Sequence, residues 1–387
     1  MDKIGKKIKV YPEPRRRVVV AMSGGVDSSV AAVLLKQAGF DVVGIMMKFW
    51  SDKSASGPEG TPLTDEKGIN RCCSTESEKL ARAVAKKIGI PFYVVNVEKE
   101  FKKKVVDYFL GEYKKGNTPN PCVVCNKEIK FGFLIKKALS LGADFIATGH
   151  YARIQNGKLF KGEDGEKDQS YFLWQLSQSQ LKRILFPVGG YTKPEVRKLA
   201  KKFRLPTAQT PESQEVCFIS KTTNEFLKKY LKTKPGKIIN TDGKILGDHN
   251  GLWFYTIGQR RGLEIQQGSA FVTQAERHSG ETKPWFVVGK NFKKNILIVS
   301  KNEKDLEKKE LVANDVNWTC PPKFSERKFW RVEVKIRYRT KSMPAKLFML
   351  GKNKVKITFS KPQRAITPGQ SAVFYRGGEL LGGGIII

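Results

Sequence analysis

Cysteine thiols are the residues of this chain most suited to covalent chemistry. There are six of them: Cys72, Cys73, Cys122, Cys125, Cys217 and Cys320. The basic N-terminus has no apolar signal segment, so we expect a cytoplasmic protein, in which a disulfide framework is not expected. The cysteines are therefore candidates for metal ligation or for sulfur chemistry.

The best placed thiols lie in "NTPNPCVVCNKEIKFG", where Cys122-x-x-Cys125 stands directly before an expected helix. A helix N-terminus and the nearby Lys127 and Lys130 favour the thiolate form. Cys217, in "PESQEVCFIS", lies between a turn and a short apolar run. Structural zinc is an alternative for the C-x-x-C pair, but it needs two further ligands.

A second segment suited to chemistry is the loop in "RRRVVVAMSGGVDSSVAAVLLKQAG". An apolar strand over 17–22 turns through Gly24 and Gly25 into a helix over 28–38, which leaves bare N–H groups at the positive end of the helix dipole. This arrangement predicts an anion site. It lacks the Gly-Lys-Ser/Thr of a Walker loop and the spaced glycines of a dinucleotide fingerprint.

Asp27 decides which anion the loop binds. A carboxylate beside phosphate repels it unless a divalent cation lies between them, and Mg²⁺ on phosphates commonly takes one or two carboxylates. We therefore predict Mg·ATP, with Asp27 as a magnesium ligand. The alternative is a first-turn acid that only favours the helix dipole. The stretch "MSGGVDSS" resembles the PP-loop of ATP pyrophosphatases, which cleave ATP to AMP and pyrophosphate while adenylating a substrate.

The first half of the chain must position these groups, and its strands and helices alternate. Strands are expected over 17–22, 42–50, 90–97 and 143–151, and helices over 28–38, 75–87, 98–113, 131–141 and 191–206. This order predicts an α/β fold with a doubly wound parallel sheet, whose ligands bind beyond the carboxyl ends of its strands. The loop, Met47, Gly149 and His150 would meet at that edge. The polar stretch Ser51–Asn70 has the length of a lid.

The second half of the chain has a different sequence pattern. Short strand-like pieces with turn dipeptides follow residue 221, and from about Asn295 the pattern is that of strands in a small barrel. Apolar and mainly basic side chains alternate along Trp330–Arg339, which gives one buried face and one charged face. We expect a basic tail over 1–17, an ATP-binding catalytic domain over 18–220, a small central domain over 221–292 and a β-barrel over 293–387.

The charge balance limits the class of partner. The chain has 387 residues and a formal net charge of +34. No apolar run approaches the length of a membrane span, so no membrane partner is expected. The excess of lysine and arginine fits either a lysine-rich surface or a polyanionic partner such as a nucleic acid. Charge alone does not decide between them.

Taken together, seven motifs resemble those of the bacterial-type tRNA-specific 2-thiouridylase (MnmA/TrmU) family. They are "MSGGVDSS", "TPNPCVVCNKEIKF", "TGHYARI", "KDQSYFL", "VCFI", "YTIGQRRGL" and "TPGQSAVFY". The resemblance implies a PP-loop domain, a small tRNA-binding central domain and a C-terminal barrel. It also implies that ATP adenylates the wobble uridine of tRNAs for Lys, Glu and Gln. Pyrophosphate leaves when the adenylate forms, and sulfur transfer to C2 then releases AMP.

The resemblance also implies roles for individual residues. ATP would be bound by Ala21, Met22, Ser23, Gly24, Gly25, Val26, Asp27, Ser28, Met47 and Gly149. The target base would lie against Asn120, Pro121 and Cys122, and the tRNA against His150, Lys167, Asp168, Gln169, Arg337, Tyr338 and Gln370. Cys125 would be the nucleophile and Cys217 the persulfide carrier, joined as a disulfide during turnover. A sulfur-relay protein or a cysteine desulfurase would supply the persulfide.

One residue departs from the family pattern. Well-known members have Asp where this chain has Cys122. Cys122, Cys125 and Cys217 could therefore hold a [4Fe–4S] cluster with one iron open to sulfide, since thiolates are its usual ligands. Persulfide and cluster chemistry both stay open at this point.

Two other functions are also compatible with the loop Ser23–Ser28. A PP-loop ligase that adenylates a small molecule explains Ser23–Ser28, but neither the paired cysteines nor the basic strand face. A catalytically inert RNA-binding protein could keep the loop as scaffold. It predicts tRNA binding that survives Asp27→Ala, with no ATP turnover.

Overall fold

A computed structural model of the chain describes residues 16–52, 74–211, 216–267, 270–271, 283–320 and 329–387. Most of the basic tail, most of the expected lid over Ser51–Asn70, and Cys72 and Cys73 lie outside these ranges. None of the helices in the described ranges is long and apolar enough to cross a membrane.

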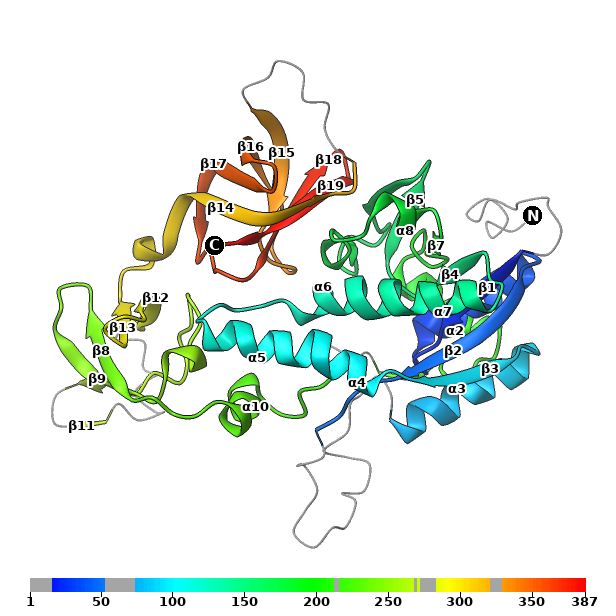
Figure 1. The fold of residues 1–387 in the computed structure, drawn as a ribbon, viewed down its shortest axis with the longest axis horizontal. Coiled ribbons are helices and arrows are strands. Elements are labelled where there is room, and N and C mark those ends of the chain that lie inside the picture. The colour runs from blue at the N-terminus through cyan, green and yellow to red at the C-terminus, as the bar shows by residue number, and fades with distance from the viewer. Residues whose placement is uncertain (1–15, 53–73, 212–215, 268–269, 272–282, 321–328) are drawn as a thin grey trace, which may run out of the picture.

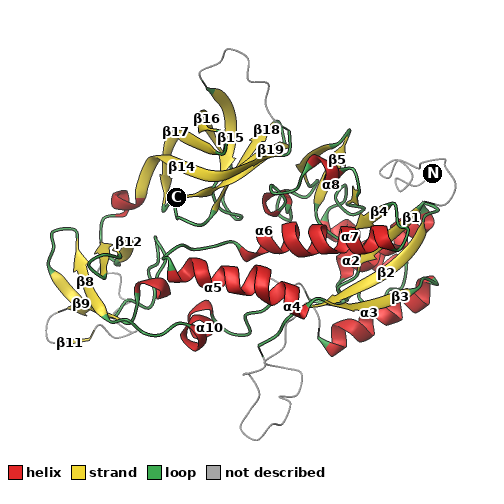
Figure 2. Cartoon of the chain, viewed as in Figure 1, coloured by secondary structure: helices red, strands yellow, loops and turns green. Residues whose placement is uncertain are grey.

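The N-terminal region is built on a five-stranded parallel sheet in the order β3-β2-β1-β4-β7 (Figures 1 and 2). Its strands are β1 (Arg17–Ala21), β2 (Asp41–Lys48), β3 (Phe92–Asn96), β4 (Phe145–Ala147) and β7 (Ile184–Leu185). Helices α2 (Val26–Gln37), α3 (Thr75–Ile88) and α9 (Lys193–Lys202) pack together in one core. The predicted α/β class is confirmed.

Strand β1 shows why the sheet is covered on both faces. Val18 and Val20 join the core formed with α2, α3 and α9, whereas Val19 joins a separate core that includes Val123 and Phe131. Successive side chains of a strand point to opposite faces, so an uninterrupted apolar strand must be buried on both sides.

The second core includes side chains of two long helical segments, drawn side by side in Figure 1, and of all three sheets. The first runs through α4 (Glu98–Phe101), a π-helical turn (Lys102–Val106) and α5 (Asp107–Lys114). The second runs through α6 (Pro121–Cys125), a π-helical turn (Asn126–Phe133) and α7 (Leu134–Ser140).

The second segment begins earlier than the expected start at Phe131, so Cys122 and Cys125 lie within the helix rather than before it. Pro121 is a favourable residue in a first helical turn. The wider π turn interrupts the 3.6-residue periodicity from which a helix is predicted, and this explains the difference.

The central region is a four-stranded sheet in the order β12-β13-β8-β9. Its strands are β8 (Gly236–Asn240), β9 (Ile245–His249), β12 (Phe286–Asn291) and β13 (Ile296–Ser300). Strand β13 pairs with both β8 and β12. The stretch 295–300, which we expected to open the barrel, therefore lies in the central sheet. Its alternating apolar pattern fits a strand in either place, and only the pairing distinguishes them.

The C-terminal region is an antiparallel barrel closed by the pairing of β14 with β19. Its strands are β14 (Glu307–Trp318), β15 (Trp330–Lys335), β16 (Met343–Gly351), β17 (Lys354–Arg364), β18 (Ser371–Arg376) and β19 (Glu379–Ile386). The predicted buried face is confirmed at Val332, Val334 and Ile336. Strands β5 (Ala152–Gln155) and β6 (Lys158–Lys161) extend this sheet beyond β19 and thereby link it to the N-terminal region.

The remaining elements are short connections. They are α8 (Gln178–Leu181), α10 (Thr223–Tyr230), β10 (Gln266–Gln267), β11 (Ala270–Phe271) and 3₁₀ turns at Ser170–Phe172, Leu252–Phe254 and Glu303–Leu306.

Candidate active site

The loop Ser23–Ser28 lies where the strand order reverses. Strand β1 has β2 on one side and β4 on the other, and parallel sheets bind their ligands beyond the carboxyl ends of the strands at such a point. Gly149 follows β4, and a Cβ at this position would lie 2.7 Å from both the carbonyl carbon of Asp27 and the nitrogen of Ser28. The loop and Gly149 therefore meet, as expected from sequence. Met47 is buried at the end of β2.

The loop has the features of an anion cradle. Helix α2 has twelve residues and begins after Gly25, which provides no side-chain cap for the first N–H groups. The Ser28 and Ser29 hydroxyls donate to the Gly25 carbonyl at 3.1 and 2.8 Å, and the Ser23 N–H donates to Ser28 Oγ at 3.2 Å. These bonds hold the turn in shape. Gly24 has a φ of +73°, which favours glycine.

Two residues that the sequence analysis missed bind Asp27. Lys193 Nζ lies 2.8 Å from each carboxylate oxygen, and the Tyr151 hydroxyl donates to Oδ1 at 2.7 Å. The Lys193 side chain is only 8 % exposed. A lysine in the first turn of α9 faces the unfavourable end of the helix dipole, which is a signal that a carboxylate compensates it.

The cysteines of the C-x-x-C pair differ in exposure. Cys122 is exposed and Cys125 is buried, both in the first turns of α6, and Cys217 is half-buried against the core that contains Cys125. The next residue, Asn126, is buried and its amide donates to the Phe172 carbonyl at 3.1 Å. Among the described residues, no three His, Cys, Asp or Glu side chains form a group that could hold a metal ion.

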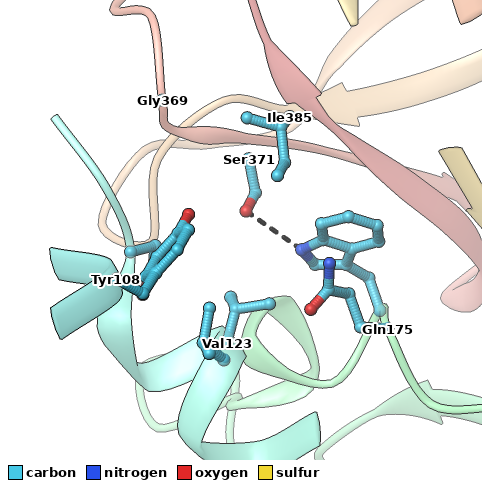
Figure 3. A pocket seen from close by; sticks show the side chains of 9 residues that line it. Tyr108, Val123, Gln175, Gly369, Ser371 and Ile385 are labelled. Carbon is cyan, nitrogen blue, oxygen red and sulfur yellow. Dashed lines mark hydrogen bonds between the residues drawn. The ribbon is translucent and has the colours of Figure 1, made fainter. Parts of the chain in front are cut away.

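A small pocket lies where α5, α6 and the barrel meet (Figure 3). It is lined by Asn120, which precedes α6, by Tyr108 of α5 and by Gln175, whose Oε1 is buried without a hydrogen-bond partner. The Trp174 indole donates to Ser371 Oγ at 3.0 Å and so joins the barrel to the segment before α8.

The base-facing candidate Asn120 also connects to the barrel. It lines the same pocket as Ser371 of β18, whose carbonyl accepts from the Tyr171 hydroxyl at 3.0 Å. Cys122, Asn120 and the barrel strand β18 are thus brought together, although they are far apart in sequence.

Two of the residues expected to contact tRNA are buried in this structure. His150 lies between Phe131 and Phe186, and its Nδ1 is 2.7 Å from Thr148 Oγ1. Burial, assisted by Lys130, lowers the pKa of His150 well below its usual value, so the ring is neutral. Asp168 is 3 % exposed and accepts bonds from the backbone N–H groups of Gly162 and Ser170.

The other expected tRNA contacts are half-buried, and several are already engaged within the chain. They are Lys167, Gln169, Arg337, Tyr338 and Gln370. Arg337 donates to the Ala365 carbonyl and Thr367 Oγ1. Gln169 Oε1 accepts from the Tyr151 N–H at 3.0 Å, and the Tyr338 ring lies 4.5 Å from that of Phe172.

Comparison with known proteins covers nearly the whole chain. Three family profiles match in succession: "tRNA methyl transferase HUP domain" over 16–221, "tRNA methyl transferase PRC-barrel domain" over 224–301 and "Aminomethyltransferase beta-barrel domain" over 308–386. The three matched segments contain, in turn, the parallel sheet, the central sheet and the strands β14–β19 of the barrel, whereas β5 and β6 of the barrel sheet fall in the first segment.

Curated relatives match at high identity. A protein named tRNA-specific 2-thiouridylase MnmA from Carboxydothermus hydrogenoformans is 45% identical over 384 residues, which is 96% of this chain and 98% of the relative. The protein of that name from Streptococcus agalactiae is 47% identical over 380 residues, 96% of this chain and 95% of its own.

Similarity to solved structures is lower. The U34-tRNA thiolase NcsA of Methanococcus maripaludis, solved with its [4Fe-4S] cluster, has 20% identity and a TM-score of 0.35 over 55% of this chain and 66% of its own.

Proposed function

Because this chain belongs to the tRNA-specific 2-thiouridylase MnmA family, we propose that it adenylates the wobble uridine of tRNA and then replaces the C2 oxygen with sulfur. The chain is a tRNA sulfurtransferase that forms 2-thiouridine. The observation that carries the proposal is the combination of an anion cradle at β1 with two cysteines at the start of α6. A small-molecule PP-loop ligase requires only the first of these.

We place the nucleotide beyond the carboxyl end of β1. The uncapped N-terminus of α2 offers its N–H groups to the phosphates. Gly149, which has no side chain, allows the backbone of Asp27 and Ser28 to lie close to the end of β4. Among the described residues, the donor to Asp27 Oδ2 is Lys193, which leaves a lone pair of this oxygen for Mg²⁺, and the ion would shield phosphate charge. Lys193 supplies a second positive charge beside the same carboxylate.

The first chemical step forms the adenylate. The uracil O2 attacks the α-phosphorus, the bond to the pyrophosphate oxygen breaks, and N3 loses its proton. A carbonyl oxygen, which is a poor leaving group, is thereby converted into a phosphate ester. We place the base against Asn120, which is half-buried, and Cys122, which is exposed, since both residues lie at the start of α6.

The second step transfers sulfur from a persulfide on Cys217. Its terminal sulfur attacks C2, and the C2–O bond breaks as AMP leaves with the former uracil oxygen. The Cys125 thiolate then attacks Sγ of Cys217, which forms the Cys125–Cys217 disulfide and leaves sulfur on C2. A thiol reductant resets the enzyme. Burial of Cys125 and half-burial of Cys217 protect these sulfurs from competing oxidants.

The described cysteine geometry does not fit a [4Fe–4S] cluster. Cys122 is exposed while Cys125 is buried, and they form no metal-holding group with Cys217 or with other described acidic or histidine residues. We therefore route no step through a cluster. A persulfide enzyme fed by a sulfur-relay protein or a cysteine desulfurase, acting on tRNAs for Lys, Glu and Gln, is the proposed form of the reaction.

One assay tests the function directly. Anaerobically purified protein is incubated with unmodified tRNA and Mg·ATP, with sulfide in one reaction and cysteine plus a cysteine desulfurase in another. In the reaction with cysteine and the desulfurase, we expect mass spectrometry of the digested tRNA to show an oxygen-to-sulfur exchange on the first anticodon uridine. ATP cleavage that depends on a small acid and not on tRNA would instead support the ligase.

The role of Cys122 can be tested by substitution. We expect Cys122→Ala to retain thiolation within about tenfold, because the thiol transfers no sulfur in the persulfide scheme. The protein should be free of iron before and after the change, as measured by metal analysis. Cys320→Ala, a change at a half-buried thiol beside the barrel, is the matched control. Brown, iron-containing protein that loses both iron and activity on Cys122→Ala would establish the cluster instead.

A further inference from the structure

The segment Gly116–Asn120, which leads into the cysteine helix α6, is held from two sides by other parts of the chain. Figure 1 shows this connection between α5 and α6 running from the central sheet to the barrel. Asn120 is the residue before α6 and Pro121 is its first residue. The position of the segment therefore sets where the helix that carries Cys122 and Cys125 begins.

The barrel holds the end nearer to α6. The Gln370 amide donates to the Thr118 carbonyl at 2.7 Å, and the Thr118 N–H donates to the Pro368 carbonyl at 2.8 Å. Gly369 has a φ of +89°, and a Cβ there would lie 2.8 Å from Thr118 N. Figure 3 shows Gly369 and Ser371 of the barrel facing Tyr108 of α5 and Val123 of α6. Backbone and barrel are in close contact here.

The central sheet holds the other end through Lys290 of β12. Lys290 Nζ donates to the Gly116 carbonyl at 3.0 Å, and Thr256 Oγ1 lies 3.2 Å from Thr118 Oγ1. A Cβ on Gly116 would lie 2.0 Å from Cζ of Phe292, so the aromatic ring rests directly on the glycine. Gly116 has a φ of +88°, which favours glycine for a second reason.

Lys290 reduces the free energy of unfolding at this position. In the described part of the chain no carboxylate pairs with it, and its ammonium is used on one backbone carbonyl. Desolvation by burial lowers the pKa of Lys290 to about 8. A lysine whose folded-state pKa is lowered disfavours the folded state while the unfolded chain holds the proton, so at neutral pH its charge opposes folding. A residue that opposes folding points to a role in activity.

We propose that Lys290 is a positioning residue for sulfur transfer, which fixes Gly116–Asn120 and thereby the start of the cysteine helix against the barrel. This inference rests on the proposed function. Because both anchors come from outside the cysteine domain, the placement of Cys122 and Cys125 depends on the packing of all three regions.

The test is Lys290→Met, which keeps an unbranched side chain and removes the charge and the donor. We expect thiolation in a single turnover at saturating tRNA to fall about tenfold, while the tRNA Kd stays within about twofold. The unfolding temperature should stay the same or rise, because a half-buried charge without a carboxylate partner among the described residues has been removed. Lys237→Met is the control, an exposed lysine of the same central sheet that pairs with Asp248 at 2.8 Å.

A second measurement does not depend on activity. Alkylation of the buried Cys125 thiol, followed by peptide mass spectrometry, should become several-fold faster in Lys290→Met, because a loosened segment exposes the start of α6. If the wild-type protein fails to thiolate tRNA, the proposed function fails while this measurement still decides the positioning role.

Three outcomes would overturn the inference. They are an unchanged saturated rate together with unchanged Cys125 alkylation, a lower rate that follows a lower unfolding temperature, and a loss confined to tRNA affinity. The second would make Lys290 a stability residue and the third a tRNA contact.

Discussion

Cys217→Ser is expected to reduce thiolation by about 10³-fold or more while pyrophosphate release stays within a few-fold of wild type. A serine hydroxyl cannot carry a persulfide, whereas the proposed nucleotide site at the end of β1 does not include Cys217. Product is measured by mass spectrometry of digested tRNA, with cysteine and a cysteine desulfurase as donor. Pyrophosphate is measured in the same reaction.

The partner variant Cys125→Ser should stop the reaction one step later. Without the Cys125 thiolate, the base stays joined to Cys217 through a disulfide, so a protein–tRNA adduct should accumulate. The adduct should run as a shifted band on a denaturing gel and disappear with a thiol reductant. Cys320→Ser should show neither effect. Full thiolation by Cys217→Ser with the desulfurase system would refute the persulfide carrier.

Lys193→Met is expected to slow ATP cleavage by about 10²-fold and to weaken ATP binding. The change leaves the Asp27 carboxylate, whose side chain is 30% exposed, with the Tyr151 hydroxyl but without its positive partner. The carboxylate would then face the phosphates at short range with the proposed Mg²⁺ as its remaining counter-charge. Nucleotide affinity and tRNA-dependent pyrophosphate release measure the two effects separately.

Lys198→Met is the matched control, since Lys198 lies on the same helix and is exposed. The unfolding temperature of both variants is recorded, because loss of a buried ion pair also affects stability. Asp27→Asn should slow ATP cleavage as well, because it removes the charge of the proposed Mg²⁺ ligand and leaves the buried Lys193 without its counter-charge. ATP cleavage by Lys193→Met at the wild-type rate would contradict the electrostatic role of this pair.

The C-terminal barrel shows what an alternating strand pattern predicts and what it leaves undetermined. The alternation along 330–339 correctly gave Val332, Val334 and Ile336 a buried face, because a strand places successive residues on opposite sides. The same kind of pattern could not assign 296–300 to the central sheet rather than the barrel, nor could it show that β5 and β6 extend the barrel sheet. Pairing partners depend on contacts between segments far apart in the chain.

For individual side chains too, the sequence motifs suggested a role and the tertiary structure determined the contacts. His150 and Asp168 stand in motifs that suggested tRNA contact, and the fold buries both. Gln370, named for the same role, donates to Thr118 beside the cysteine helix. Whether these residues also reach tRNA stays a prediction. Their present partners come from helices and strands that no local pattern relates to them.

The local sequence by itself determined the chemistry of this protein: an anion-binding turn over Ser23–Ser28, a C-x-x-C pair and alternating elements that build a parallel sheet. These features depend on backbone preferences and periodicity within a few residues, which a single stretch contains. Only the tertiary structure decided that Lys193 and Tyr151 bind Asp27, and that Lys290 and Gln370 hold the approach to Cys122. Such contacts arise when distant elements pack, and their energies depend on burial that no local pattern records.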